Sequence, residues 1–169
     1  MEHTKTWHQT RVVAWRAEVA STHGDFSCLK STQEEADTKM ILHSINACDR
    51  GAKRLFVFAQ DTDVLVLMIR RYPRLPDESY FVPSTERHIS ISQIYEALGN
   101  LKASALPGFH ELSGCDTTGS LKGKGKLSYW KVFESAGESA PVALSQLGCN
   151  APVTDEIINT LEQFICRVY

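Results

Sequence analysis

The sequence has 169 residues and a formal net charge of -2, with 43% hydrophobic and 22% charged residues. This length suffices for one domain with a buried core, and the composition is that of an ordinary globular protein, which excludes extensive disorder. The weak net charge excludes a generally basic nucleic-acid-binding surface. Any contact with nucleic acid therefore has to come from a local basic patch.

The five cysteines are widely spaced and form no Cys-x-x-Cys pair: Cys28, Cys48, Cys115, Cys149 and Cys166. An odd number at such spacing argues against a disulfide scaffold and a structural zinc site, and it fits a reducing compartment. No signal peptide is recognisable, and the longest apolar run, residues 64–69, is too short to cross a bilayer. We therefore expect a soluble intracellular protein without a membrane partner; a nuclear location would also fit.

The first half of the chain is expected to hold a helix, a buried strand and a second helix. Residues 1–30 give no clear assignment. A hydroxyl cap followed by acids in Ser31–Glu35 predicts a helix that ends near Cys48. The continuous apolar run Leu55–Ala59 has the length of a strand, and such a run is typical of a parallel sheet covered by helices on both faces. Residues 64–71 follow as a helix.

The second half is expected to begin with a hairpin and to continue as helices. Ser79–Val82 and His88–Ile91 resemble its two strands, and further helices are expected at residues 92–98, 101–114, 127–134, 142–147 and 154–168. Alternating helices and buried strands predict an α/β layered fold without a linker that divides domains. Ligands of open parallel sheets bind beyond the carboxyl ends of the strands, where Asp61 and Asp63 fall.

Asp37 occupies an unusual position for a carboxylate. On the expected helix it heads the apolar stripe that Ile41, Ile45 and Cys48 continue, so it faces the core instead of the solvent. A buried charge requires a partner, and a metal ion would supply one. The alternative is an acid near a helix N-terminus that the helix dipole favours.

The other acids each have a structural alternative. Glu35 could form a surface ion pair with Lys39 one turn later. Asp61 and Asp63 stand where a strand ends and a helix begins, so either could cap that helix, but two acids this close need their repulsion relieved, which favours metal ligation. Asp116 could form an Asx-turn.

Histidines and cysteines do not form a convincing metal site. His110 and Cys115 could be imagined as zinc ligands, but no second pair completes the site. His43 lies within a helix, where it is expected to be packed or exposed.

A local basic patch follows the last acid. It comprises Lys122, Gly123, Lys124, Gly125 and Lys126, with Lys131 one turn further on. Glycines let a backbone approach phosphate closely, and amides at a helix N-terminus attract it. A solvated lysine loop is the alternative, and proximity to the acidic motifs favours the phosphate-binding interpretation.

In this order, the motifs resemble those of the flap-endonuclease and XPG-type branch of the PIN-like nucleases. In that family a Glu-Ala-Glu/Asp motif opens a helix and an Asp-x-Asp motif ends a strand. A Gly-x-Asp motif then precedes a helix-hairpin-helix of the form Gly-x-Gly. The matching residues are Glu35, Asp37, Asp61, Asp63, Asp116, Gly123 and Gly125.

Several stretches look closer still to an uncharacterised subgroup of animal proteins. Its members are often multicopy, which suggests that they derive from mobile elements. They are residues 34–38, 61–65, 106–110, 114–118, 123–126 and 161–166. The resemblance implies a three-layer PIN-like (5' nuclease) fold with a mainly parallel central sheet and a helix-hairpin-helix. Residues 31–136 would form the nuclease core, residues 137–169 C-terminal helices, and residues 1–30 remain poorly assigned.

The resemblance departs from the family at its start. The family's fold begins with a strand that carries another metal-binding Asp, and residues 1–30 contain no match for it. We therefore expect the chain to be the C-terminal part of a longer protein, lacking the N-terminal part of the fold.

The activity implied by the resemblance is hydrolysis of phosphodiester bonds in DNA or RNA, with DNA the more expected partner. Two Mg²⁺ or Mn²⁺ ions about 4 Å apart would activate water and stabilise the leaving oxygen. The catalytic and metal-binding residues would be Glu35, Asp37, Asp61, Asp63 and Asp116. Gly123 and Gly125 would present backbone amides to the strand, with a monovalent cation at the hairpin, and the lysines of the patch would contact phosphates.

Two other functions stay open. The first is a nucleic-acid-binding module with an incomplete catalytic centre, which the missing acidic strand favours. The second is a protein-interaction domain that reuses the fold, in which residues 154–169 dock a partner through Phe164, Ile165 and Val168, unless these side chains belong to the core.

Overall fold

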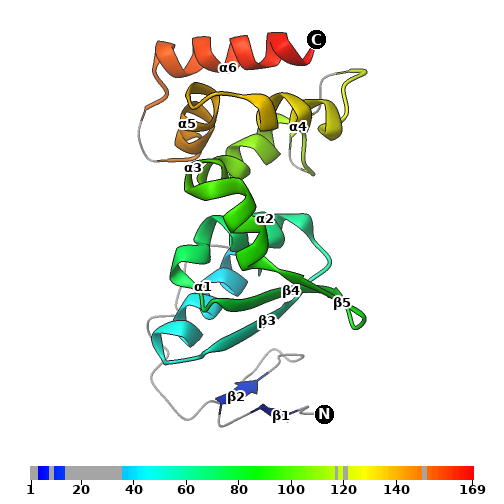
Figure 1. Ribbon diagram of the computed structural model, residues 1–169, viewed down its shortest axis with the longest axis vertical. Helices are drawn as coiled ribbons and strands as arrows, with labels where there is room; N and C mark the ends of the chain where they lie inside the picture. The colour runs from blue at the N-terminus through cyan, green and yellow to red at the C-terminus, as the bar shows by residue number, and fades with distance from the viewer. Residues whose placement is uncertain (1–3, 8–9, 14–35, 117, 120–121, 150–151) are drawn as a thin grey trace.

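The computed structural model describes residues 4–7, 10–13, 36–116, 118–119, 122–149 and 152–169 (Figure 1). The strands are β1 (Thr4–Trp7), β2 (Thr10–Val13), β3 (Arg54–Phe58), β4 (Glu78–Ser84) and β5 (Arg87–Ser90). The helices are α1 (Ala36–Asp49), α2 (Thr62–Arg71), α3 (Ile91–Leu112), α4 (Lys126–Ser135), α5 (Ser139–Gln146) and α6 (Asp155–Val168). The protein is thus α/β, as expected, and no described helix is long and apolar enough to cross a membrane.

The described strands form two separate sheets. The hairpin β1–β2 is antiparallel, and the other sheet has the order β3-β4-β5. Strands β3 and β4 are parallel because the helix α2 lies between them in sequence, whereas the short turn after β4 makes β5 antiparallel. The predicted hairpin is confirmed, but the expectation of a mainly parallel sheet is wrong for the described strands, since their sheet is mixed.

One face of the sheet lies against the core. Val57 of β3 and its partner Phe81 of β4 are buried at 7% and 3% exposure and belong to the core with residues of α1 and α2. On the opposite face, Phe56 is 40% exposed and Phe58 68% exposed. The prediction that β3 is buried on both faces is therefore wrong for the described part of the chain. An apolar run does not reveal how many faces are covered, because successive side chains point to opposite sides.

Helix α3 connects the sheet to the C-terminal helices (Figure 1). Gly99 interrupts it with φ 72° and ψ 162°, a conformation that glycine adopts without steric cost. The two helices predicted around this residue are therefore two segments of one kinked element. Beyond the kink, Gly108 lies so close to α5 that a Cβ at this position would stand 2.1 Å from the carbonyl oxygen of Leu144.

The C-terminal helices pack on one another and on α3. Phe109 of α3 contacts Phe133 of α4 with ring centroids 4.8 Å apart, and Phe133 is fully buried. Helix α6 packs on α4 and α5 and buries Phe164 and Val168. These two side chains are core residues, so they do not form the partner-docking surface that the sequence left open.

Candidate functional site

Asp61 and Asp63 lie just beyond the carboxyl end of β3, at the start of α2. Asp61 is the N-cap of this helix, and its Oδ1 accepts a hydrogen bond from the backbone amide of Asp63 at 2.9 Å. The capping alternative is therefore confirmed for Asp61. Capping uses one of its carboxylate oxygens and leaves the side chain exposed to solvent.

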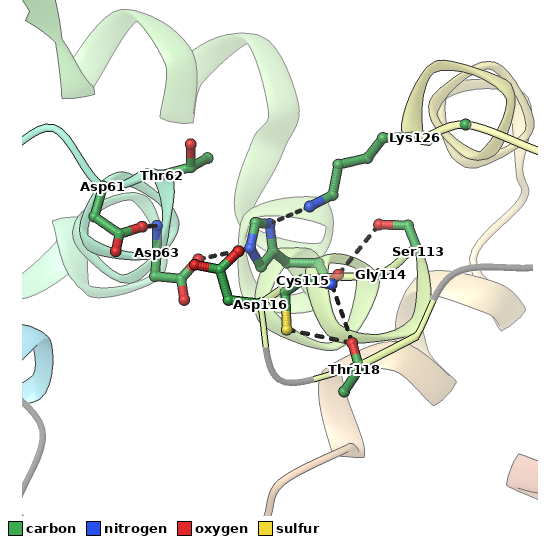
Figure 2. A pocket seen from close by; sticks show the side chains of 11 residues that line it. Asp61, Thr62, Asp63, Ser113, Gly114, Cys115, Asp116, Thr118 and Lys126 are labelled. Atoms are coloured by element: carbon green, nitrogen blue, oxygen red, sulfur yellow. Dashed lines mark hydrogen bonds and ion pairs between the residues drawn. The ribbon is translucent and has the colours of Figure 1, made fainter.

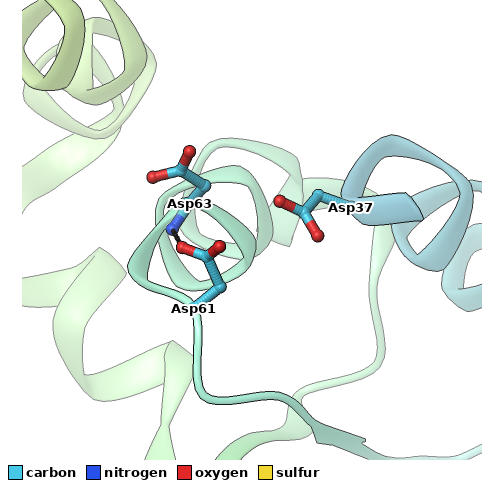
Figure 3. Close-up of side chains that lie close together, drawn as sticks. All are labelled: Asp37, Asp61 and Asp63. Carbon is cyan, nitrogen blue, oxygen red and sulfur yellow. Dashed lines mark hydrogen bonds between the residues drawn. The ribbon is translucent and has the colours of Figure 1, made fainter. Parts of the chain in front are cut away.

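Asp37 approaches these two acids from the first turn of α1 (Figure 3). One carboxylate oxygen from each of Asp37, Asp61 and Asp63 lies within 4.8 Å of the others, which is close enough for a single ion to contact all three. The buried Ile41 and Ile45 continue the stripe that Asp37 heads, and they fix α1 against the core. Three predicted acids from two helices are therefore neighbours in space.

Close carboxylates destabilise one another unless positive charge or hydrogen-bond donors lie among them. All-oxygen donor sets suit hard cations such as Mg²⁺ and Mn²⁺. The donor chemistry of Asp37, Asp61 and Asp63 therefore fits such an ion, although exposed acidic groups also occur without one. Glu35, the fourth acid expected in this part of the site, lies outside the described residues.

Asp116 lines the same pocket as Asp61 and Asp63 (Figure 2). The pocket has a volume of about 430 Å³ and is lined by Asp61, Thr62, Asp63, His110, Ser113, Gly114, Cys115, Asp116, Thr118, Gly125 and Lys126. Among the described residues, the group of three close carboxylates does not include Asp116. Asp61, Asp63 and Asp116 thus border one cavity, and Asp37 lies close to the first two.

Side-chain and backbone hydrogen bonds tie the loop that carries Asp116 to the end of α3. Thr118 donates its hydroxyl to the carbonyl oxygen of Glu111 at 2.7 Å, and the amide of Cys115 donates to the Thr118 hydroxyl at 3.1 Å. The amide of Thr118, which an Asx-turn at Asp116 would use, donates to the Cys115 carbonyl oxygen at 3.3 Å. The described hydrogen bonds therefore do not support the Asx-turn alternative.

The basic patch is divided between two locations. Gly125 is the N-cap of α4, Lys126 is its first residue, and both line the pocket. The side chain of Lys126 enters it from the side opposite Asp61 and Asp63 (Figure 2). Lys124 instead has its ammonium 5.1 Å from the ring centroid of Tyr169. Lys122 and Lys131 are exposed and do not belong to the pocket lining. Of the four expected phosphate contacts, only Lys126 therefore faces the acidic cavity.

His110 connects the two walls of the pocket. Its Nε2 is 2.7 Å from Oδ1 of Asp63, and its Nδ1 is 3.0 Å from Nζ of Lys126. The His110 side chain is 10% exposed and that of Asp63 is 38% exposed. Both ring nitrogens are thus engaged, so His110 is not the zinc ligand that could be imagined from the sequence.

The sequence did contain a signal for His110. It follows Leu106 by four residues and Ala103 by seven, so it continues the buried face of α3. A histidine on such a face needs partners for its ring nitrogens, which the sequence alone does not name.

Three comparisons were made for this chain, with protein-family models, with curated proteins and with solved structures, and none found a match.

Proposed function

We propose that this protein hydrolyses phosphodiester bonds of nucleic acid with the help of divalent metal ions. The observation that carries the proposal is the convergence of Asp37, Asp61 and Asp63, three acids from two helices, beside a pocket that also holds Asp116 and Lys126. The finer assignment, a PIN-like fold with a helix-hairpin-helix, belongs to the same proposal. Its support is the order of the motifs and the position of Gly125 at the start of α4.

The acids would hold Mg²⁺ or Mn²⁺. Asp37, Asp61 and Asp63 supply oxygen ligands within reach of one ion, and Asp116 is available to a second ion across the pocket. When bound, such ions polarise phosphoryl oxygens and supply an activated water for attack on phosphorus. This chain's own contribution is to hold the carboxylates in place through two helix starts that pack on the sheet.

The opposite wall of the pocket suits a phosphate. Lys126 presents an ammonium group, and the N-terminus of α4 carries the positive end of the helix dipole. Glycine at the N-cap leaves room for close approach of a sugar-phosphate backbone. Carboxylates without cations would repel the polyanionic nucleic acid. Once metal ions neutralise them, a phosphate can bind between the acids and Lys126.

A second function is favoured by a specific observation. Asp61 already caps α2, and Asp63 already pairs with His110, so both acids have structural roles without a metal ion. A nucleic-acid-binding module that does not cleave would retain these contacts. It would bind nucleic acid equally well in EDTA and in Mg²⁺.

The deciding experiment measures cleavage of labelled single-stranded, hairpin and flap substrates, as DNA and as RNA, in Mg²⁺, Mn²⁺ or EDTA. We expect metal-dependent cleavage. Its rate should fall by on the order of 100-fold or more in Asp37→Asn, Asp63→Asn and Asp116→Asn, because each change removes a ligand of the metal ions that stabilise the charge of the transition state. Glu86→Gln, an exposed acid in the turn between β4 and β5, is the matched control and should cleave normally.

Cleavage that persists in EDTA or in Asp63→Asn and Asp116→Asn would contradict the proposal. Tight binding without cleavage of any substrate would favour the binding module instead.

A further inference from the structure

His110 contacts both an acid and a base of the proposed site, and no other described residue of the pocket lining is recorded with contacts to both. We infer that His110 is a positioning residue, which orients the Asp63 carboxylate for a metal ion and holds Lys126 at the pocket for a phosphate. This inference rests on the proposed function. It means that the buried His110 ring connects the metal-binding acid to the phosphate-binding lysine.

The contacts define which nitrogen of His110 carries the proton. The ammonium of Lys126 has hydrogen atoms to donate and no lone pair, so Nδ1 of His110 must act as the acceptor. A neutral imidazole with an accepting Nδ1 carries its hydrogen on Nε2. That hydrogen is donated to Oδ1 of Asp63 at 2.7 Å. Lys126 and Asp63 therefore require the same tautomer, with the hydrogen on Nε2 and the lone pair on Nδ1.

For Asp63, the consequence is a fixed carboxylate. Oδ1 accepts from His110, which leaves Oδ2 and the remaining lone pair of Oδ1 for an ion near Asp37 and Asp61. Hydrogen bonds of this kind orient the ligands of metal sites, and their removal typically costs ~10–100-fold in metal affinity or activity. The backbone amide of Asp63 fixes Asp61 in a comparable way.

For Lys126, the consequence is a restrained ammonium group. A lysine side chain on an exposed surface samples many rotamers, and ordering it costs conformational entropy. His110 occupies one of the three ammonium hydrogens and keeps the other two available at the pocket. A phosphate bound there would meet a side chain that is already in place.

The ring is suited to this task because it is buried and held at the end of a helix. His110 stands in the last turn of α3, is 8% exposed, and its carbonyl oxygen accepts a hydrogen bond from the Ser113 hydroxyl at 3.2 Å. The neighbouring Phe109 packs against Phe133 and Trp130 of α4, which places the start of that helix, with Lys126, beside the end of α3.

Two substitutions separate the two contacts. In His110→Gln the side-chain amide reaches the place of Nε2, so it can still donate to Asp63, but the contact with Lys126 is lost. In His110→Asn the side-chain oxygen reaches the place of Nδ1, so it can still accept from Lys126, but the donor to Asp63 is lost. His43→Gln, an exposed histidine on α1, is the matched control.

The probes are Mn²⁺ alone, followed by electron paramagnetic resonance, and a labelled single-stranded DNA in EDTA, followed by fluorescence anisotropy. We expect His110→Asn to weaken Mn²⁺ binding by ~10-fold or more while its DNA affinity stays near that of the wild type. His110→Gln should do the reverse, with near-normal Mn²⁺ binding and several-fold weaker DNA binding. His43→Gln should change neither.

A merely structural histidine would give another result. Both variants would then lower Mn²⁺ and DNA binding together, in proportion to a lower melting temperature, or would change neither, and either outcome overturns the inference.

A spectroscopic measurement keeps the inference testable if the His110 variants do not fold. In long-range proton–nitrogen spectra of the wild type, we expect one of the six histidines to show a neutral ring protonated on Nε2. Lys126→Met, a change at an exposed position, should keep the hydrogen on Nε2, which Asp63 still accepts, but should shift the Nδ1 resonance because that nitrogen loses its donor. A His110 ring protonated on Nδ1, or an Nδ1 resonance that is unchanged in Lys126→Met, would refute the assigned role.

These readouts are independent of cleavage. A wild type that binds Mn²⁺ and DNA without hydrolysing any substrate would reject the proposed activity and leave the His110 test intact. Normal cleavage with parallel losses in both His110 variants would reject the positioning role alone.

Discussion

The two walls of the pocket are built in different ways. Asp61 and Asp63 of the acidic wall are positioned by local contacts, since Asp61 caps the helix that begins one residue later and accepts a hydrogen bond from the amide of Asp63. The basic wall depends on tertiary packing, because Lys126 reaches the pocket only through α4 lying on α3, sixteen residues away from His110. A short motif therefore orients Asp61 and Asp63 by itself, whereas Asp37, Asp116 and the basic wall reach this place only in the folded chain.

The largest effect expected from breaking this arrangement comes from Gly108. An alanine there would place its Cβ 2.1 Å from the backbone oxygen of Leu144, so α3 and α5 would have to separate. We expect Gly108→Ala to lower the free energy of unfolding by about 3 kcal/mol, at the upper end for an overpacked site. Urea unfolding followed by circular dichroism measures this change.

Gly137→Ala provides the matched control, because nothing lies within 4 Å of a Cβ at that position. It should change the free energy of unfolding by no more than about 0.5 kcal/mol. An unaltered urea midpoint in Gly108→Ala would show that the two helices are not packed as closely as described.

A smaller effect is expected from replacing single lysines, and it distinguishes a lysine that lines the pocket from one outside it. Lys126→Ala should weaken DNA binding, reduce the salt dependence of binding by about one log-log unit, and lower kcat, because this lysine lines the pocket. Lys131→Ala should weaken binding without a change in kcat, since Lys131 is exposed outside the pocket. Salt titrations and steady-state kinetics compare the two, and equal effects on kcat would argue against the distinction.

The smallest effect concerns how α4 is anchored beneath the basic wall. Tyr129 is fully buried, and its hydroxyl has no hydrogen-bond partner among the described residues. A buried unpaired hydroxyl is unfavourable, so Tyr129→Phe should raise the free energy of unfolding by about 1 kcal/mol. Tyr95→Phe is the contrasting control and should be slightly destabilising, because the Tyr95 hydroxyl donates to Asn100 at 3.0 Å.

The same residue predicts a dependence on alkaline pH. Burial raises the pKa of Tyr129 above its ordinary value of 10.0, and Tyr169 raises it further. Above pH 10 the unfolded chain loses this proton before the native protein does, so the stability falls as the pH rises further. Urea midpoints measured below and above pH 10 should show a smaller alkaline loss in Tyr129→Phe than in the wild type. An equal loss in both would mean that Tyr129 does not contribute to it.

The helices were largely predictable because their signals are local. The helix predicted at residues 127–134 is α4, Lys126–Ser135, and the one predicted at residues 154–168 is α6, which begins after Thr154 as its N-cap. Thr154 accepts a hydrogen bond from the amide of Ile157 and so caps the helix, a role that threonine commonly has at this position. Such patterns involve residues within one turn of each other, so they are readable without the fold.

The sheet was less predictable. The run Leu55–Ala59 correctly indicated a strand, but one of its faces, with Phe56 and Phe58, is exposed in the described part of the chain. Which face is covered depends on elements that pack there from elsewhere in the sequence. An apolar run contains no information about them.

The sequence by itself determined the helical pattern and the candidate acids, and it offered capping as an alternative role for Asp61 or Asp63, since propensity, caps and motif spacing act over a few residues. Only the tertiary structure decided that Asp37 joins Asp61 and Asp63, and that Lys126 alone among four lysines faces the acidic cavity. It also decided that His110 lies between acid and base. The physical reason is that side chains far apart in sequence meet only when helix packing brings their backbones together, and that packing is a property of the whole core.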